Sequence, residues 1–419
     1  MLNRVGIVVC IYLGTCLLVA REASAQLYAQ TLGQIYAESD HVVLAERLGA
    51  AEGDNTFQFR VTESLKQQGE LETPAEESPS ASLWGENSRL IAKLGRSGEC
   101  YVIFGRNVRD RIVWSQAWGI QRSSLKDVEE AMHGSKQGVE RLLSFAPFLT
   151  SKEPLLARNA QLEFIAAADG DFEQLNDQNL DREQILLRIK QVLPQLAKGD
   201  SQENRNSRSF LLLERRLLFD LLARCGTKSD ADWVEQQLLE VKNAESQHVS
   251  HDMIVCYLQL KGSSGLSLVE REFLDDNSSF RNSYELILAL RYFIAHASHS
   301  ISRKEIVGVL RKVLEEPTLA DLVIMDLARL EDWGSIDTLI ALASDASKQN
   351  WCRLPVVNFL RICPTEQARE ELRRLSEVDS ELLKRANFFF TDSMIANGEW
   401  KELDMRIRPE FPGRNRWGC

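Results

Sequence analysis

The stretch Leu319-Ala320-Asp321-Leu322-Val323-Ile324-Met325-Asp326-Leu327-Ala328-Arg329 decides the fold of the larger part of the chain. Apolar side chains fill it, and only two aspartates and one arginine interrupt them. A helix that is apolar almost all round is normally buried among other helices. We therefore predict that this stretch is the buried inner helix of a helix pair, and that Leu327 lies in the core.

The helical pattern extends far beyond this stretch. Apolar residues recur every three to four positions from Ser124 almost to the end of the chain, which is typical of successive amphipathic helices. Ser302 and Glu305 form a capping box, Gly226 fits a helix end, and Ser229 is expected to cap the helix that follows. Helices are expected to begin near residues 137, 153, 182, 209, 230, 249, 266, 283, 303, 319, 335, 350, 366 and 380. Helix pairs of roughly 34 to 47 residues are typical of HEAT-like solenoids.

The first part of the chain has a different period. From about Leu27 to Gln121 apolar and polar residues alternate, which indicates half-buried strands. Residues 69–80, a segment with four glutamates and two prolines, interrupt the alternation and are predicted to form a solvated loop. The expected strands are His41–Leu48, Phe57–Val61, Cys100–Phe104 and Ile112–Trp118. Four or five short strands with one long loop predict a small barrel or sandwich.

Together, the two periods predict an α+β multidomain protein. A signal peptide would occupy residues 1–25, a β-rich barrel residues 26–124, an α-helical HEAT-like repeat domain residues 125–400, and a basic tail residues 401–419. The boundary between the two domains is placed at residue 124 because the apolar period changes there from that of strands to that of helices.

The first 25 residues have the features of a secretory signal peptide. Met1–Arg4 is basic, Val5–Ala20 is an apolar run, and Ala23-Ser24-Ala25 is a small-residue cleavage pattern, so the mature chain is expected to begin at Gln26. An uncleaved N-terminal anchor is the alternative. Because no later apolar run is long enough to span a bilayer, we expect an exported protein, periplasmic or extracellular, without a transmembrane span after cleavage.

Six cysteines follow the predicted signal peptide: Cys100, Cys225, Cys256, Cys352, Cys363 and Cys419. Their even number permits disulfides in an exported protein, but they are scattered along the chain. Most are expected to be small core residues, because free cysteine is readily buried. Cys352 and Cys363 are not expected to pair, since one helix would hold them about 16 Å apart.

Two groups of residues carry a resemblance to known families. Residues 39–45 (SDHVVLA), 57–61 (FQFRV) and 98–104 (GECYVIF) resemble the netrin-like, inhibitor-type OB barrels of secreted bacterial proteins. Residues 319–329 with Trp333, and residues 351–360 (WCRLPVVNFL), resemble a family of uncharacterised exported bacterial proteins with HEAT-like helical tails. The resemblance implies a barrel and a helical tail over most of the mature chain. Its motifs are packing motifs, so it implies no catalytic residues.

One residue departs from the netrin-like pattern. Inhibitors that resemble this barrel chelate a catalytic zinc through a cysteine at the mature N-terminus, whereas Gln26 is expected there. Metalloprotease inhibition by that route is therefore not predicted.

The sequence lacks the motifs of common enzyme classes: HExxH, GxSxG, Walker A, the dinucleotide-binding glycine pattern and CxxC. Two His-x-x-His pairs remain, His248 with His251 and His296 with His299, which on a helix would each place two imidazoles on one face. Both pairs fall at expected helix ends, and spacing supplies no third ligand to either. We expect them to be structural, and a metal site built from them is the alternative.

Two tryptophans and the C-terminal tail are candidate binding residues. Trp333 and Trp351 would offer indole platforms to a carbohydrate or peptide, although each stands at an expected corner between helices, where packing in the core is favoured. Arg414 and Arg416 belong to a basic tail that is interpreted either as a docking segment for an acidic partner or as a terminus without function.

Charge and composition narrow the functional class. The net charge of −11 opposes general nucleic-acid binding, and an apolar fraction of 44% indicates a globular chain. We predict an exported, non-catalytic interaction or scaffold protein that binds a protein or cell-envelope partner through the helical solenoid, the barrel or both, without a cofactor. The alternative is a metal-dependent hydrolase that uses the four histidines of the two pairs.

Overall fold

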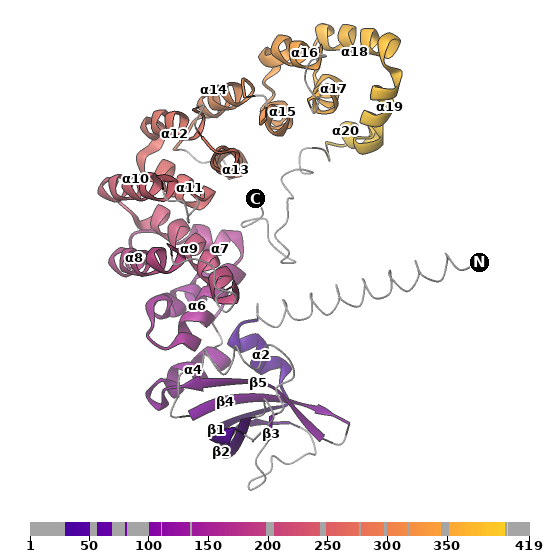
Figure 1. The fold of residues 1–419 in the computed structure, drawn as a ribbon. Helices are drawn as coiled ribbons and strands as arrows, with labels where there is room; N and C mark the ends of the chain where they lie inside the picture. The colour runs from indigo at the N-terminus through magenta and orange to yellow at the C-terminus, as the bar shows by residue number, and fades with distance from the viewer. Residues whose placement is uncertain are drawn as a thin grey trace, which may run out of the picture. The chain divides into compact units, whose positions relative to one another are not determined.

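The computed structural model (Figure 1) divides into two compact units, residues 1–185 and residues 186–419. The structure describes residues 30–50, 57–68, 80–81, 100–109, 111–134, 136–197, 205–243, 249–275, 278–296, 300–316, 318–344, 352–398 and 400. The predicted signal peptide, most of the predicted acidic loop and the basic tail lie outside these residues.

The first unit is built on an antiparallel sheet of five strands in the order β3-β2-β1-β4-β5. The strands are β1 (His41–Ala50), β2 (Phe57–Gln67), β3 (Ser80–Ala81), β4 (Cys100–Val108) and β5 (Arg111–Ile120). The buried core of the sheet consists of Val43, Ala45, Phe59, Tyr101, Ile103 and Ala117. The four strands predicted from alternation are confirmed, and the central strand β1 pairs with both β2 and β4.

A short helix precedes the sheet. Alternation typical of strands was expected from about Leu27, but α2 (Leu32–Glu38) is helical, so this part of the prediction is wrong. The Thr31 hydroxyl accepts a hydrogen bond from the Gln34 amide, and the Gln34 side chain accepts one from the Thr31 amide. This capping box satisfies backbone N–H groups that a helix start otherwise leaves unpaired, and it stabilises a helix too short to show a clear period.

Helices follow the sheet within the first unit. They are α4 (Leu125–His133), α5 (Gly138–Phe145), α6 (Pro154–Ala166) and α7 (Asp169–Glu173), with 3-10 turns η1 (Arg122–Ser124) and η2 (Ala146–Thr150). α4 contacts α2, and α6 contacts β5. The Glu153 carboxylate, at the start of α6, accepts the Gln121 amide at 2.9 Å. Strands therefore give way to helices near residue 124, while the compact unit continues to residue 185; the domain boundary at 124 stays a prediction.

The described part of the second unit contains helices and no strands. Its helices are α8 (Arg182–Ala197), which begins in the first unit, α9 (Arg205–Cys225), α10 (Lys228–Asn243), α11 (His251–Lys261), α12 (Leu266–Phe273), α13 (Phe280–Ala295), α14 (Arg303–Val313), α15 (Ala320–Arg329), α16 (Ile336–Ser344), α17 (Arg353–Ile362), α18 (Glu366–Val378), α19 (Ser380–Phe389) and α20 (Asp392–Ala396). Each predicted helix is found close to its expected start. The additional helices α4, α7 and α20 are short and were not expected.

The second unit repeats one packing pattern. α9 contacts α11, α11 contacts α13, α15 contacts α17, and α17 contacts α19. We call the helices α9, α11, α13, α15, α17 and α19 the inner row. The outer row consists of α10, α12, α14, α16 and α18, and each of its helices contacts the inner-row helix that follows it in the sequence. Helices in this unit therefore pack chiefly against near neighbours along the chain.

Burial distinguishes the inner-row helix α15 from its neighbour α14 in the outer row. In α15 residues 323–328 are buried throughout, and the relative exposure of Leu327 is 0%. The prediction of a buried helix around Leu327 is thus confirmed. The outer-row helix α14 is amphipathic instead, because Val309 is buried and Arg311 is exposed. α15 is therefore covered on several sides, whereas α14 is covered on one.

The predicted helix caps had mixed outcomes. The capping box of Ser302 and Glu305 is confirmed at the start of α14. The predicted cap at Ser229 is wrong, because this residue lies inside α10, which begins one position earlier. Thr227 precedes the helix, and its amide donates to the Asp230 carboxylate at 2.6 Å. The acid stands three residues after Thr227, which is the spacing that a cap requires.

The described cysteines agree with the expectation that most are core residues. Cys100, Cys225, Cys256 and Cys363 are buried and Cys352 is half-buried, whereas Cys419 lies outside the described residues. Cys352 and Cys363 stand at the two ends of α17, so the helix keeps them apart. Burial also raises the pKa of the Cys256 thiol well above its ordinary value, which makes this thiol unreactive.

Candidate functional site

Buried charged side chains join the helices of the second unit. Burying a lone charge is costly, so buried charges are normally paired. The acids Glu214, Asp252 and Asp326 have exposed side-chain fractions of only 1%, 7% and 0%. Each is paired with an arginine of an earlier helix: Arg188–Glu214 between α8 and α9 at 2.6 Å, Arg215–Asp252 between α9 and α11 at 3.4 Å, and Arg291–Asp326 between α13 and α15 at 2.9 Å.

A histidine with two partners stands in the middle of this series. We call Arg215, Arg216, His251, Asp252 and Glu285 the His251 cluster; its residues come from α9, α11 and α13. The Nδ1 atom of His251 lies 2.9 Å from Oε2 of Glu285, and the same oxygen accepts the His251 backbone amide at 2.8 Å. On the other side of the ring, Nε2 lies 2.6 Å from Nη2 of Arg216.

The two partners determine where the proton of His251 lies. A guanidinium can only donate, so Nε2 of His251 must accept from Arg216. An ionised carboxylate can only accept, so Nδ1 carries the proton and donates it to Glu285. The imidazole is therefore neutral and protonated at Nδ1, as inferred from its hydrogen bonds. In this arrangement no lone pair of the ring is left to bind a metal.

Asp252 is the buried acid of the cluster. Burial raises the pKa of its carboxyl group, but nearby positive charge, chiefly that of Arg215, outweighs burial and holds the pKa below its ordinary value. Asp252 is therefore ionised at neutral pH. Its Oδ2 atom lies 3.4 Å from Nε of Arg215, so the pair is held by charge more than by a hydrogen bond.

The second buried acid, Asp326, has two arginine partners. Its carboxylate accepts from Nε of Arg291 at 2.9 Å and from Nη1 of Arg329 at 2.6 Å. Arg291 also donates to the Leu322 carbonyl at 2.7 Å, one turn earlier in α15. In the sequence, Asp326 stands out only as an interruption of an apolar helix. That interruption is the signal that could have identified it as half of a buried pair.

The His251 cluster is suited to fastening helices more than to catalysis. A catalytic imidazole needs a reacting group within hydrogen-bond reach. Both ring nitrogens of His251 are instead bonded within the protein, to Arg216 and Glu285. Among the described residues, no group of three or more His, Cys, Asp and Glu side chains is placed to hold a metal ion. What the cluster does is link α9, α11 and α13.

The described histidines of the two predicted pairs have separate environments. His251 begins α11, whereas His296 follows α13 and is exposed. Nδ1 of His296 lies 2.9 Å from the Tyr292 carbonyl oxygen of its own helix, and the two rings stack. His248 and His299 lie outside the described residues.

Of the predicted binding residues, only Trp333 falls within the described part of the chain. Its ring centroid lies 5.5 Å from that of Phe359 in α17, with the rings edge to face, and the indole is half-buried. This contact agrees with the packing interpretation of Trp333. Trp351, Arg414 and Arg416 lie outside the described residues.

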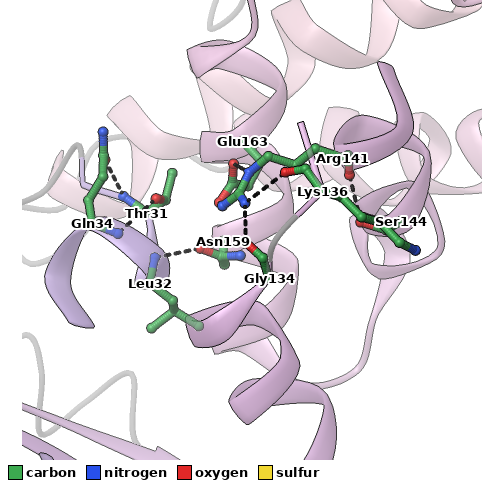
Figure 2. Close-up of polar contacts among 9 residues, drawn as sticks. All are labelled: Thr31, Leu32, Gln34, Gly134, Lys136, Arg141, Ser144, Asn159 and Glu163. Carbon is green, nitrogen blue, oxygen red and sulfur yellow. Dashed lines mark hydrogen bonds and ion pairs between the residues drawn. The ribbon is translucent and has the colours of Figure 1, made fainter. Parts of the chain in front are cut away.

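A separate polar cluster fastens α2 within the first unit (Figure 2). Asn159 of α6 is 2% exposed, and its Oδ1 atom accepts the Leu32 amide at 2.7 Å, which joins residues 127 positions apart. Arg141 of α5 donates to both carboxylate oxygens of Glu163, at 2.7 and 2.6 Å, and to the Gly134 carbonyl at 3.2 Å. This cluster could not be predicted from the sequence, because its partners share no local spacing.

Comparison with family models, curated proteins and solved structures finds no match to this chain. In the part of the chain that the structure describes, no helix is both long enough and apolar enough to cross a membrane. The function must therefore be argued from the geometry of the chain itself.

Proposed function

We propose that this chain is an exported, non-catalytic binding protein in which a netrin-like OB barrel precedes a HEAT-like solenoid. The observation that carries the proposal is the repeated contact of one inner-row helix with the next, such as α9 with α11, α11 with α13 and α15 with α17. A stack of helix pairs offers an extended surface instead of one enclosed centre. Such a surface suits the binding of a large partner better than the turnover of a small substrate.

The sheet of the first unit supports the barrel part of the proposal. OB folds are five-stranded, partly open barrels. This sheet also has five strands, and its two edge strands, β3 and β5, lie near each other. A sheet whose edges approach one another is curved toward closure.

The buried ion pairs support a scaffold role for the second unit. A pair such as Arg291–Asp326 is satisfied at one register of α13 and α15 only, since a shift of one residue moves a side chain by about 1.5 Å along the axis and turns it away. Comparable pairs join α8 to α9 and α9 to α11. Fixed registers along the row would present a partner with a preformed surface, which lowers the entropy cost of binding.

The export part of the proposal has a direct test. Cleavage after Ala25 predicts that mass spectrometry of the native protein finds Gln26 at the N-terminus. A native N-terminus at Met1 or Leu2 would contradict cleavage and support the uncleaved anchor.

The binding role is tested with the full mature chain as bait in extracts of the cell envelope. We expect a stoichiometric partner with the native chain and with Glu366→Ala, whose side chain is 59% exposed on α18. The amount of this partner that is recovered should fall with Asp326→Ala, which breaks the buried ion pair between α13 and α15. Stoichiometric zinc in the native protein that is lost in His251→Gln would instead support the hydrolase alternative and contradict the proposal.

A further inference from the structure

His251 makes two contacts of opposite polarity. Its Nε2 accepts from Arg216 of α9 at 2.6 Å, and its Nδ1 donates to Glu285 of α13 at 2.9 Å. The side chains of His251 and Glu285 are 13% and 17% exposed, so water competes weakly for either contact. One imidazole therefore connects three inner-row helices, and each connection depends on a different ring nitrogen.

A second proton on the ring would change these two contacts in opposite directions. An imidazolium carries N–H groups on both nitrogens and no acceptor, as does the Arg216 guanidinium. Two positive donors cannot bond at 2.6 Å, so the hydrogen bond between Arg216 of α9 and His251 of α11 would be lost. The contact with Glu285 would become a hydrogen bond between opposite charges, which is stronger than the neutral one.

Charged side chains face His251 from three helices. α9 directs Arg215 and Arg216 at the cluster, α11 supplies Asp252, and α13 supplies Glu285. Asp252 is paired with Arg215 and also interacts through its charge with His251 and Arg216. α10 directs its Glu235 to the Tyr257 hydroxyl instead, at 3.0 Å. The carboxylate that contacts the ring is Glu285, which lies across α11 from α9.

We propose that His251 is an acid-sensitive link between α9 and α11, which opens when the imidazole takes up a proton while the link between α11 and α13 persists. The charge of an ordinary histidine side chain changes between about pH 5 and 8, and this range sets the conditions of the tests. Because helices of a stack are held by their neighbours, opening one interface would alter the register between the two parts of the inner row that meet there. This regulation lies beyond the proposed binding function and does not depend on it.

The first test measures the proton position directly in the full chain. Nitrogen-15 NMR of the histidine rings, with His251 assigned by its loss in His251→Gln, should show the Nδ1-protonated neutral tautomer near neutral pH. In acid the same ring should gain a proton on Nε2. An Nε2-protonated tautomer near neutral pH, or a ring that does not titrate above about pH 5, would overturn the proposal.

The second test measures the link itself by hydrogen exchange of the full chain, corrected for intrinsic exchange rates. Acidification from about pH 8 to about pH 5.5 should raise the opening of amides at the α9–α11 contact about tenfold, as expected for the loss of one hydrogen bond to a charged group. Amides at the α11–α13 contact should keep their protection or gain some.

Two variants and one control separate protonation of His251 from a general effect of acid. His251→Gln cannot titrate, and Arg216→Gln removes the opposing positive charge, so both should abolish the selective opening. His296→Gln, at an exposed ring bonded to its own helix, should behave as the native chain does. Selective opening that persists in His251→Gln, or equal opening of both contacts in the native chain, would overturn the proposal.

Discussion

The two units hold their helices together in different ways. In the first unit, contacts join distant parts of the chain: β1 pairs with β4, and Leu32 bonds with Asn159, 127 positions away. In the second unit, ion pairs such as Arg291–Asp326 span 35 positions, about one helix pair. Contacts of the first kind require most of the unit to be in place, whereas contacts of the second kind add up from neighbour to neighbour. The units should therefore lose stability differently when they are cut or mutated.

Truncation of the first unit should have the largest effect. A segment of residues 26–124 keeps the strands but loses α6, and with it the Asn159 contact to Leu32 and the Glu153 contact to Gln121. We expect cooperative thermal unfolding, followed by near-ultraviolet circular dichroism, for residues 26–185 and none for residues 26–124. Equal cooperativity of both segments would show that the sheet folds without these helices and would support the sequence-based boundary at 124.

The matched cut in the second unit should be tolerated. A chain that ends at residue 363 lacks α18, α19 and α20 but keeps the contacts among the earlier helices of the inner row. We expect a lower unfolding midpoint and a helical circular dichroism signal in proportion to the helices that remain. Loss of all helical signal would contradict neighbour-by-neighbour stabilisation.

Among single substitutions, Asp326→Ala should cost the most. It leaves the Arg291 and Arg329 guanidinium groups, which are 6% and 5% exposed, without their carboxylate. Breaking one side of a buried ion pair typically costs about 3 to 5 kcal/mol. Denaturant unfolding of the full chain measures the change. Glu366→Ala is the control, because an exposed charge typically contributes less than about 0.5 kcal/mol. Equal changes in the free energy of unfolding for the two variants would show that the ion pairs of Asp326 do not stabilise the fold.

The neighbouring substitution Leu327→Ala should cost somewhat less. Leu327 is fully buried in α15, and removing a buried leucine side chain typically costs about 2 to 5 kcal/mol through lost contacts and the cavity left behind. The matched control is Leu187→Ala in α8, where half of the residue is exposed. If denaturant unfolding gives Leu327→Ala the smaller change of the two, the assignment of α15 as a buried helix is wrong.

Local patterns in the sequence were sufficient to predict most elements. The start of α14 follows from Ser302 and Glu305, which lie three residues apart, and the burial of α15 follows from its apolar composition. Strands such as β4 follow from apolar residues within one short segment. Each of these features is set by residues that are near neighbours in the chain, so a single sequence displays it.

Contacts between distant residues could not be predicted in this way. The sequence does not show which arginines pair with Asp252 and Asp326, because only the packing of α9 on α11 and of α13 on α15 brings them together. Leu32 and Asn159 show no common pattern, and α2 is too short for a helical period to appear. The sequence indicated His251 as an alternative metal ligand, and the structure shows that this residue connects helices. Its partners Arg216 and Glu285 lie 35 and 34 positions away, so no local pattern indicates them.

The smallest effect tests the comparison most closely, because the described residues of each unit include a complete capping box. Thr31→Ala and Ser302→Ala remove the same kind of acceptor from α2 and α14, and such a change typically costs about 0.5 to 2 kcal/mol. Thr31 is buried beside the Leu32–Asn159 bond, whereas Ser302 is exposed.

In the first unit the cap of α2 cannot open without straining the hydrogen bond that holds α2 to α6. We therefore expect Thr31→Ala to lower protection from hydrogen exchange across the sheet and its helices, and Ser302→Ala to lower it only in the first turn of α14. If both variants affect only the helix that they cap, the first unit is no more cooperative than the second, and the distinction between the two units fails.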